Sequence, residues 1–135
     1  MAGIKRFEDI EAWQKARRLV QAIYALTEDG AFSKDYFLRD QVRRAAVSMT
    51  SNIAEGFARR GSKEFANFLS MTHGSAAELQ SHLYVARDRR YLAAEEFQKL
   101  YDGAAEVSRM VQALMKYLRS NSQLSTRNSE LKERI

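Results

Sequence analysis

Residues 94–119 read AEEFQKLYDGAAEVSRMVQALMKYLR, and this stretch decides the fold class. Its apolar residues alternate at spacings of three and four without a slip, in the series Phe97, Leu100, Ala104, Val107, Val111, Leu114 and Leu118. That period is typical of a helix that buries one stripe against neighbouring helices. Because the period passes in phase through Asp102-Gly103, we predict one unbroken helix and no turn at this point.

Three further segments carry a helical period. We predict helices over about 7–26, 36–58 and 63–91, with a loop over 27–35, where the period is lost and Gly and Ser occur. The chain contains no proline, which costs about 3 kcal/mol inside a helix, so long helices are permitted. In the turn at 59–62 we expect Gly61 to take a left-handed conformation and Ser62 to cap the following helix.

Four helices with one apolar stripe each can hide these stripes only against each other. We therefore predict an all-α fold, an antiparallel up-down-up-down four-helix bundle over residues 1–119. Residues 120–135 are polar and rich in Ser and Asn, and we expect a mobile tail there. On the first helix, Trp13, Ala16, Val20 and Ile23 share one face, and Ile10, Leu19, Tyr24 and Leu26 widen it. Additional apolar residues belong either to ordinary surface or to a subunit interface: Ala12, Ala22, Leu26, Tyr101, Met110, Met115 and Tyr117.

Several function classes find no support in the sequence. The chain has no cysteine, no apolar leader and no apolar run near the roughly 20 residues of a membrane span, so we expect a cytoplasmic protein without membrane contact. GxSxG, GxGxxG and GxxxxGK[ST] motifs are absent. His73 and His82 are nine residues apart and therefore lie on opposite helix faces. We expect no metal, no cofactor and no enzymatic activity.

Charge is the one chemical lead. The chain has 22 basic and 17 acidic residues, and the segment 36–63 alone holds six basic and two acidic ones. From this segment we take five candidate nucleic-acid-binding residues: Arg43, Arg44, Arg59, Arg60 and Lys63. Arg87, Arg89 and Arg90 would mark the opposite end of the bundle. The alternative interpretation is a solvated surface with ion pairs.

Small and polar residues accompany the stripes of the second and third helices. They are Asn52, Glu55 and Gly56 on the second, and Gly74, Ser75 and Glu78 on the third. We interpret them as a partly buried structural network, in which Glu55 or Glu78 pairs with Arg43 or Arg44 and the glycines permit close helix approach. The competing interpretation is a paired-carboxylate acid/base site.

Three motifs in this order carry a family resemblance. QVRRAAVS at 41–48, SNIAEG at 51–56 and GSAAEL at 74–79 make the chain similar to the bacterial 23S ribosomal RNA intervening-sequence proteins, over roughly residues 7–119. Thr50 stands where that family commonly has proline. The resemblance implies a four-helix bundle that assembles into a ring of five, and genes sometimes found inside ribosomal RNA intervening sequences. It implies no established molecular activity. A related bundle fold serves as the basic accessory subunit of diversity-generating retroelements.

These observations lead to two hypotheses on function. The first is a non-enzymatic homo-oligomer that binds RNA or DNA through phosphate contacts. The second is a scaffold or adaptor ring that recognises a protein partner through apolar surface. In a ring of five, each basic cluster would recur five times and its field would grow accordingly.

Overall fold

The computed structural model describes residues 3–134, and the side chains of residues 3–121. A short 3-10 helix at Phe7–Asp9 precedes α1 (Glu11–Thr27), and a single-turn helix, α2 (Gly30–Lys34), leads into α3 (Tyr36–Ala58). Two long helices follow, α4 (Ser62–Asp88) and α5 (Ala94–Arg134). Within residues 3–134 no strand is present, and no helix combines the length and apolar character that a bilayer crossing requires.

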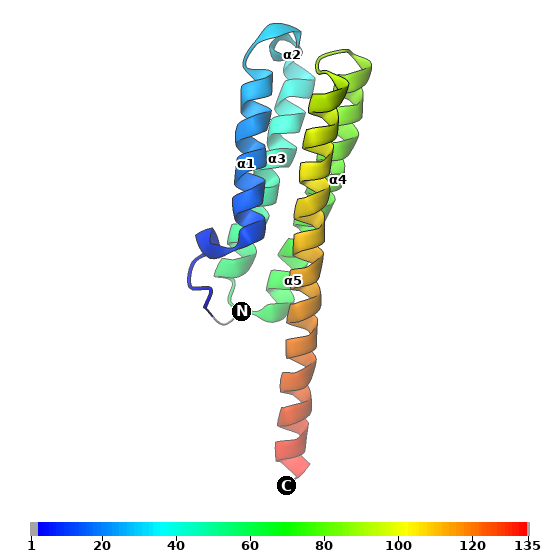
Figure 1. Cartoon of the computed structure of the whole chain (residues 1–135). Helices are drawn as coiled ribbons and strands as arrows, with labels where there is room; N and C mark the ends of the chain where they lie inside the picture. The colour runs from blue at the N-terminus through cyan, green and yellow to red at the C-terminus, as the bar shows by residue number, and fades with distance from the viewer. Residues whose placement is uncertain (1–2, 135) are drawn as a thin grey trace.

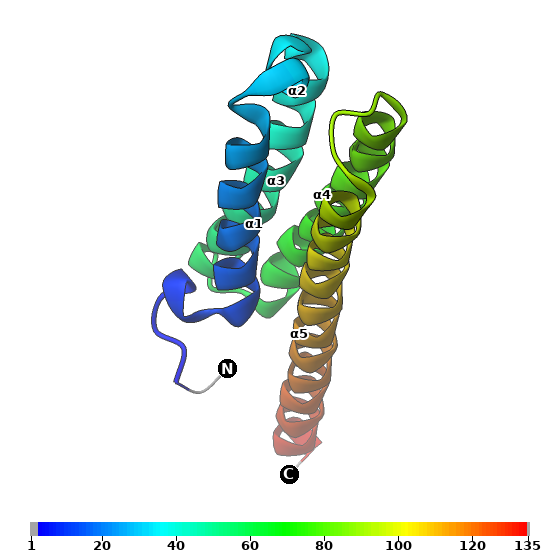
Figure 2. The same cartoon turned by 45° about the horizontal axis from the view of Figure 1, so that its top comes forward.

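The four long helices form the predicted antiparallel bundle. α1 and α4 run in one direction and α3 and α5 in the other, so the α3–α4 turn and the start of α1 share one end (Figure 1). α3 packs on α1 and α4, and α5 packs on α4 and α1, which closes the ring of helices. The pairs α1/α3 and α4/α5 are separately visible when the molecule is turned (Figure 2). The prediction of fold class is confirmed.

Besides the end of α4 at Asp88, three residues before the predicted position 91, the helix boundaries differ from the prediction at three places. The first helix begins at Glu11, because a 3-10 turn occupies residues 7–9. The expected loop over 27–35 contains α2, whose Phe32 is buried and stacks on Tyr91 with ring centroids 5.1 Å apart. The third difference lies at the C-terminus, where α5 runs past Arg119 to Arg134 and beyond the other helices (Figure 1). The end that we placed at Arg119 is therefore wrong, whereas the mobility of 120–135 stays a prediction.

The turn between α3 and α4 is built one residue earlier than we predicted. Arg60 takes the left-handed conformation, with φ of 66°. Gly61 is extended and occupies the N-cap position, and Ser62 is the first residue of α4. A helix that ends at Ala58 places its left-handed residue two positions later, and here that position falls on an arginine. Arg60 is thereby held at the very end of the bundle.

The core follows the stripe predicted over residues 94–119 and is shifted on the first helix. The apolar residues of α5 that set the period are buried, except for Leu114, which is half-buried. On α1, Ala16 and Ile23 are buried as expected, but Trp13 and Val20 are only half-buried. Leu19, which we also expected on this face, lies in the core, and so does Ala12. The burial of Ala12 removes it from the candidates for a subunit interface.

Two glycines lie where helices approach closely. A Cβ on Gly56 would lie 2.6 Å from Phe68 Cβ and 3.0 Å from Phe65 Cδ1, so the close approach of α3 and α4 requires glycine there. Gly103 lies within the unbroken helix α5, as predicted, and a Cβ there would lie 3.1 Å from Leu19 Cδ1. Gly74 is exposed and faces open space, so the expectation that it permits close approach is wrong.

Candidate nucleic-acid interface

Arg43 is occupied by contacts within the bundle. Its Nε donates a hydrogen bond of 2.8 Å to Thr27 Oγ1, and its guanidinium lies over the Tyr24 ring at 4.4 Å. Thr27 is fully buried and also donates to the carbonyl of Ile23 at 2.7 Å. Arg43 therefore satisfies a buried hydroxyl and fastens α3 to the end of α1. These contacts leave it poorly placed to bind phosphate.

Arg44 of α3 is paired with Glu78 of α4, a member of the predicted polar network. It bonds to Glu78 Oε1 and, at 2.9 Å, to Gln41 Oε1. His82 Nε2 lies 3.3 Å from the same Glu78 oxygen. The pairing of Glu78 with one of the two arginines is thus confirmed, and it joins α3 to α4. With a carboxylate at its tip, Arg44 carries little free charge toward solvent.

A second polar group lies one turn further along the α3–α4 interface. Ser48 Oγ and Ser75 Oγ are 2.9 Å apart, and Asn52 Nδ2 donates to Ser48 Oγ at 3.0 Å and to the Ser48 carbonyl at 2.9 Å. Ser48 connects Asn52 and Ser75, two predicted members of the network, although its own role was not recognised in the sequence. Within residues 3–121 no buried side-chain nitrogen or oxygen lacks a partner. The geometry is that of helix-to-helix hydrogen bonds.

Glu55 is not a member of this network. It is exposed and pairs with Arg59 of the same helix at 3.1 Å. The guanidinium of Arg59 also lies 5.4 Å from the Phe68 ring centroid. Two carboxylates could share acid/base work only if they faced a common site. Since Glu55 and Glu78 are engaged by different cations, nothing brings them together.

Arg60 and Lys63 differ from the other three candidates. Both are exposed, and within residues 3–121 neither has a carboxylate partner or a hydrogen bond to another side chain. Arg44 and Arg59 are fifteen residues apart on α3, which is about 22 Å along the helix axis. The five candidates therefore do not form one site. Among these five, only Arg60 and Lys63, at the end of the bundle, have no ion pair, side-chain hydrogen bond or aromatic contact within residues 3–121.

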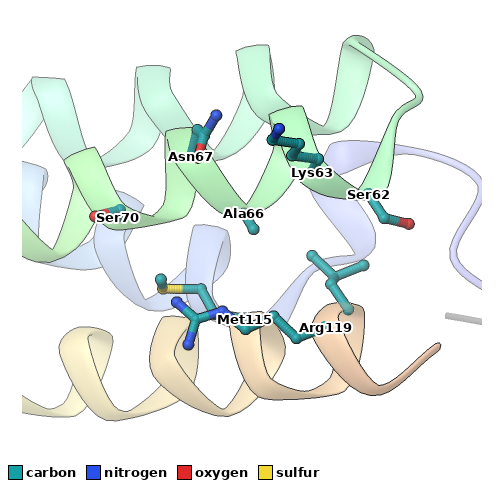
Figure 3. A pocket seen from close by; sticks show the side chains of 8 residues that line it. Ser62, Lys63, Ala66, Asn67, Ser70, Met115 and Arg119 are labelled. Carbon is teal, nitrogen blue, oxygen red and sulfur yellow. The ribbon is translucent and has the colours of Figure 1, made fainter. Parts of the chain in front are cut away.

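The structure adds two cations at that end which sequence reasoning missed. A shallow groove of about 340 Å³ lies between the start of α4 and α5, and Lys63 and Arg119 both line it. Figure 3 shows Ala66 projecting from α4 toward Met115 and Arg119 of α5. Lys5 lines a separate groove with Arg60. No local signal linked Lys5 or Arg119 to the α3–α4 turn, because only the antiparallel packing brings them there.

The two ends of the bundle differ in charge. We call residues 5–9, 55–64 and 115–121 the basic end. It holds seven basic side chains against four acidic ones: Lys5, Arg6, Arg59, Arg60, Lys63, Lys116 and Arg119 against Glu8, Asp9, Glu55 and Glu64. The opposite end, residues 27–40 and 87–99, holds six basic and seven acidic side chains. The cluster Arg87, Arg89 and Arg90 does lie there, as predicted, at an end where acidic side chains outnumber basic ones by one.

Two features of the titratable groups concern metal binding and helix packing within the described residues. No group of three or more His, Asp or Glu side chains there could hold a metal ion. A hydrogen bond from Lys15 and its charge, at 3.0 Å, lower the pKa of Glu106 below its usual value. This pair is half-exposed and joins α1 to α5, so it contributes to the bundle and belongs to no pocket.

Fold and charge together define the class: a bundle of four long antiparallel helices with one basic end. The family of 23S rRNA-intervening sequence proteins matches residues 8–113, and the chain belongs to this family. The resemblance seen in the three motifs is thereby confirmed.

A solved structure gives the same architecture. The crystal structure of a protein with unknown function from the S23 ribosomal protein family of Bacteroides thetaiotaomicron is similar, with a TM-score of 0.66 and 20% identity. The match covers 78% of this chain and 94% of that one. At this identity the likeness concerns the fold alone. No curated protein matches the chain.

Proposed function

We propose that the protein is a non-enzymatic, cytoplasmic RNA-binding protein whose basic end contacts phosphates. The observation that carries the proposal is the exposure of Arg60 and Lys63 without carboxylate partners among the described residues, beside Arg119. Free cations are what counterion release requires, whereas a paired arginine gains little by contacting a phosphate. The description of the family, which refers to an intervening sequence of 23S rRNA, favours RNA over DNA.

Assembly strengthens this proposal. We infer that the chain forms a homopentamer, as the family resemblance implies. Five copies with a net charge of +5 each would carry +25, and five basic ends would act on one polyanion. A modest local excess of charge would then give strong binding, because each additional contact is made at high effective concentration.

A charge-neutralising pair of variants tests the proposal. Arg60→Gln with Lys63→Gln removes two charges from the basic end, and Arg89→Gln with Arg90→Gln removes two from the opposite end. The pairs are matched, since Arg60 and Arg90 both have left-handed backbones, with φ of 66° and 62°. Gel shifts with a structured RNA at several salt concentrations give the slope of log K against log salt.

The expected slopes follow from the number of free cations. Lys5, Arg60, Lys63 and Arg119 in one protomer predict a slope of about −3 to −4 per basic end. The variant at the basic end should reduce the magnitude of the slope by about 2, and the control pair should leave it unchanged. Equal effects of both pairs, or binding that ignores salt, would refute phosphate contact at the basic end.

A second candidate function rests on exposed apolar side chains away from the basic end. Phe37 is 77% exposed and Tyr36 65% exposed at the start of α3, and Val85 is 45% exposed on the adjoining α4. Surfaces of this kind favour protein partners. A scaffold or adaptor would lose its partner on Phe37→Ser and would be indifferent to the changes at Arg60 and Lys63. The two candidate functions are therefore distinguished by which variant abolishes binding, the change at Phe37 or the changes at Arg60 and Lys63.

A further inference from the structure

Three shallow grooves adjoin one another at the basic end. The groove between α4 and α5 has a volume of about 340 Å³, and a second, of about 230 Å³, shares Ser62 and Leu118 with it. A third, of about 640 Å³, shares Phe57 and Arg60 with the second. We call the three together the end track. It leads from residues 5–8 across the α3–α4 turn to α5.

The end track is strongly cationic. Five basic side chains line it and one carboxylate does, namely Lys5, Arg6, Arg60, Lys63 and Arg119 against Glu8. Glu8 lies 3.8 Å from Arg6, so these two neutralise each other. Four cations are left to face a ligand along the track. A ligand that fills it must therefore be anionic over more than one groove.

Aromatic rings alternate with these cations. Tyr117 is 42% exposed and lines the second groove. Phe57 is half-buried and lines both the second and third grooves. Its ring is held edge-on against the buried Phe65, with centroids 6.0 Å apart, which limits its freedom. The Phe57 ring is held by the bundle, and both rings line a cationic groove, where a flat apolar surface can contact a ligand.

We propose that the end track binds an unpaired stretch of RNA, with bases against Tyr117 and Phe57 and phosphates on Arg60, Lys63 and Arg119. The inference rests on the proposed function and adds the structural class of the RNA. In a duplex the base faces stack on each other, so a duplex can satisfy the cations of the track but not its rings. A single strand can satisfy both, because each unstacked base presents a face to an aromatic side chain.

Fluorescence anisotropy with two labelled RNAs of equal phosphate number tests this inference. One is a poly-uridine single strand and the other a perfect hairpin duplex. Tyr117→Leu removes the exposed ring, and Tyr117→Phe keeps the ring without the hydroxyl. Tyr36→Leu is the matched control, since Tyr36 is an exposed tyrosine at the opposite end of the bundle. Circular dichroism verifies that each variant keeps its helices.

The expected result is tighter binding of the single strand than of the duplex. Tyr117→Leu should weaken the single strand by about 5-fold or more and leave the duplex unchanged, because stacking acts on unpaired bases alone. Tyr117→Phe and Tyr36→Leu should both bind like the unaltered protein. If Tyr117→Leu loses helicity, Phe57→Leu serves as the second test variant, and it too should weaken binding of the single strand and not of the duplex.

The contrary outcomes separate the inference from the proposed function. Equal affinity for both RNAs with no effect of Tyr117→Leu, but with a salt slope that depends on Arg60 and Lys63, would overturn the inference and leave phosphate binding intact. Failure of both RNAs to bind, with binding of a labelled poly-glutamate peptide instead, would overturn both and point to an acidic protein partner.

Discussion

Replacing Gly56 by alanine tests the packing between α3 and α4 that holds the basic end together. The substitution favours the helix itself by about 1 kcal/mol, because alanine loses less backbone entropy than glycine. The added Cβ would lie 2.6 Å from Phe68 Cβ, an atom fixed to the backbone of α4, so the two helices must move apart. Overpacking of this kind costs about 1–3 kcal/mol. We expect a net loss of about 1 kcal/mol.

Gly74→Ala is the matched control within the same helix pair. Gly74 is also helical, but nothing lies within 4 Å of the position its Cβ would take. The gain in helix propensity is then unopposed, and we expect Gly74→Ala to stabilise the protein by about 0.5–1 kcal/mol. The two variants receive the same chemical change and differ only in what the new methyl group meets.

Urea unfolding followed by circular dichroism at one fixed protein concentration measures the difference. Fixing the concentration keeps any contribution of assembly constant between the variants. The free energies of unfolding should differ by about 1.5–2 kcal/mol between Gly74→Ala and Gly56→Ala, with the latter below the unaltered protein. Equal stabilisation by both substitutions would refute the close approach of α3 and α4 at Gly56.

Three further predictions concern the contacts between helices and the assembly. Arg43→Met should lower the free energy of unfolding by about 1–2 kcal/mol in urea titrations, since it removes a hydrogen bond to buried Thr27 and a cation–π contact with Tyr24. Arg44→Met should lower it less, because its ion pair with Glu78 is exposed. A larger loss from Arg44→Met than from Arg43→Met would contradict this assignment. The folded-state pKa of Glu106 is lowered by Lys15, so this pair stabilises the protein above pH 4.5 and the effect is lost as pH falls through the folded pKa. Glu106→Gln should therefore lower the urea midpoint more at pH 7 than at pH 3, and an equal decrease at both would count against it. Native mass spectrometry should give about 77.5 kDa, five times 15.5 kDa, and a 15.5 kDa species alone would exclude the ring.

The sequence contained enough to predict the fold class and most of the core. A period of three and four over α5 leaves one apolar face, and in a chain without a strand pattern such a face can be buried only against other helices. The bounds of α3 agree with the prediction at 36–58, because Asp35 caps its start and the period ends at Ala58. The core face of α1 was predicted less well, since its apolar residues cover more than one side and only the neighbouring helices select among them.

The candidate site was predicted in part, and the reason is visible in individual arginines. Arg43 and Arg60 are alike in sequence context, as each belongs to an exposed-looking basic pair. Arg43 donates a hydrogen bond to Thr27, sixteen residues earlier, whereas Arg60 has no partner among the described side chains. A pattern along the chain records how much positive charge exists, but it does not record which carboxylates or hydroxyls the packing brings near.

The sequence alone determined that the chain forms long helices, that they bury their apolar stripes together and that the protein carries an excess of positive charge. Only the tertiary structure decided where this charge remains free. Helix formation depends on contacts between residues three and four positions apart, which a sequence pattern records. The basic end instead joins residues near 5, 60 and 119, which are far apart in the sequence. They lie together because the antiparallel helices begin and end at the same end of the bundle.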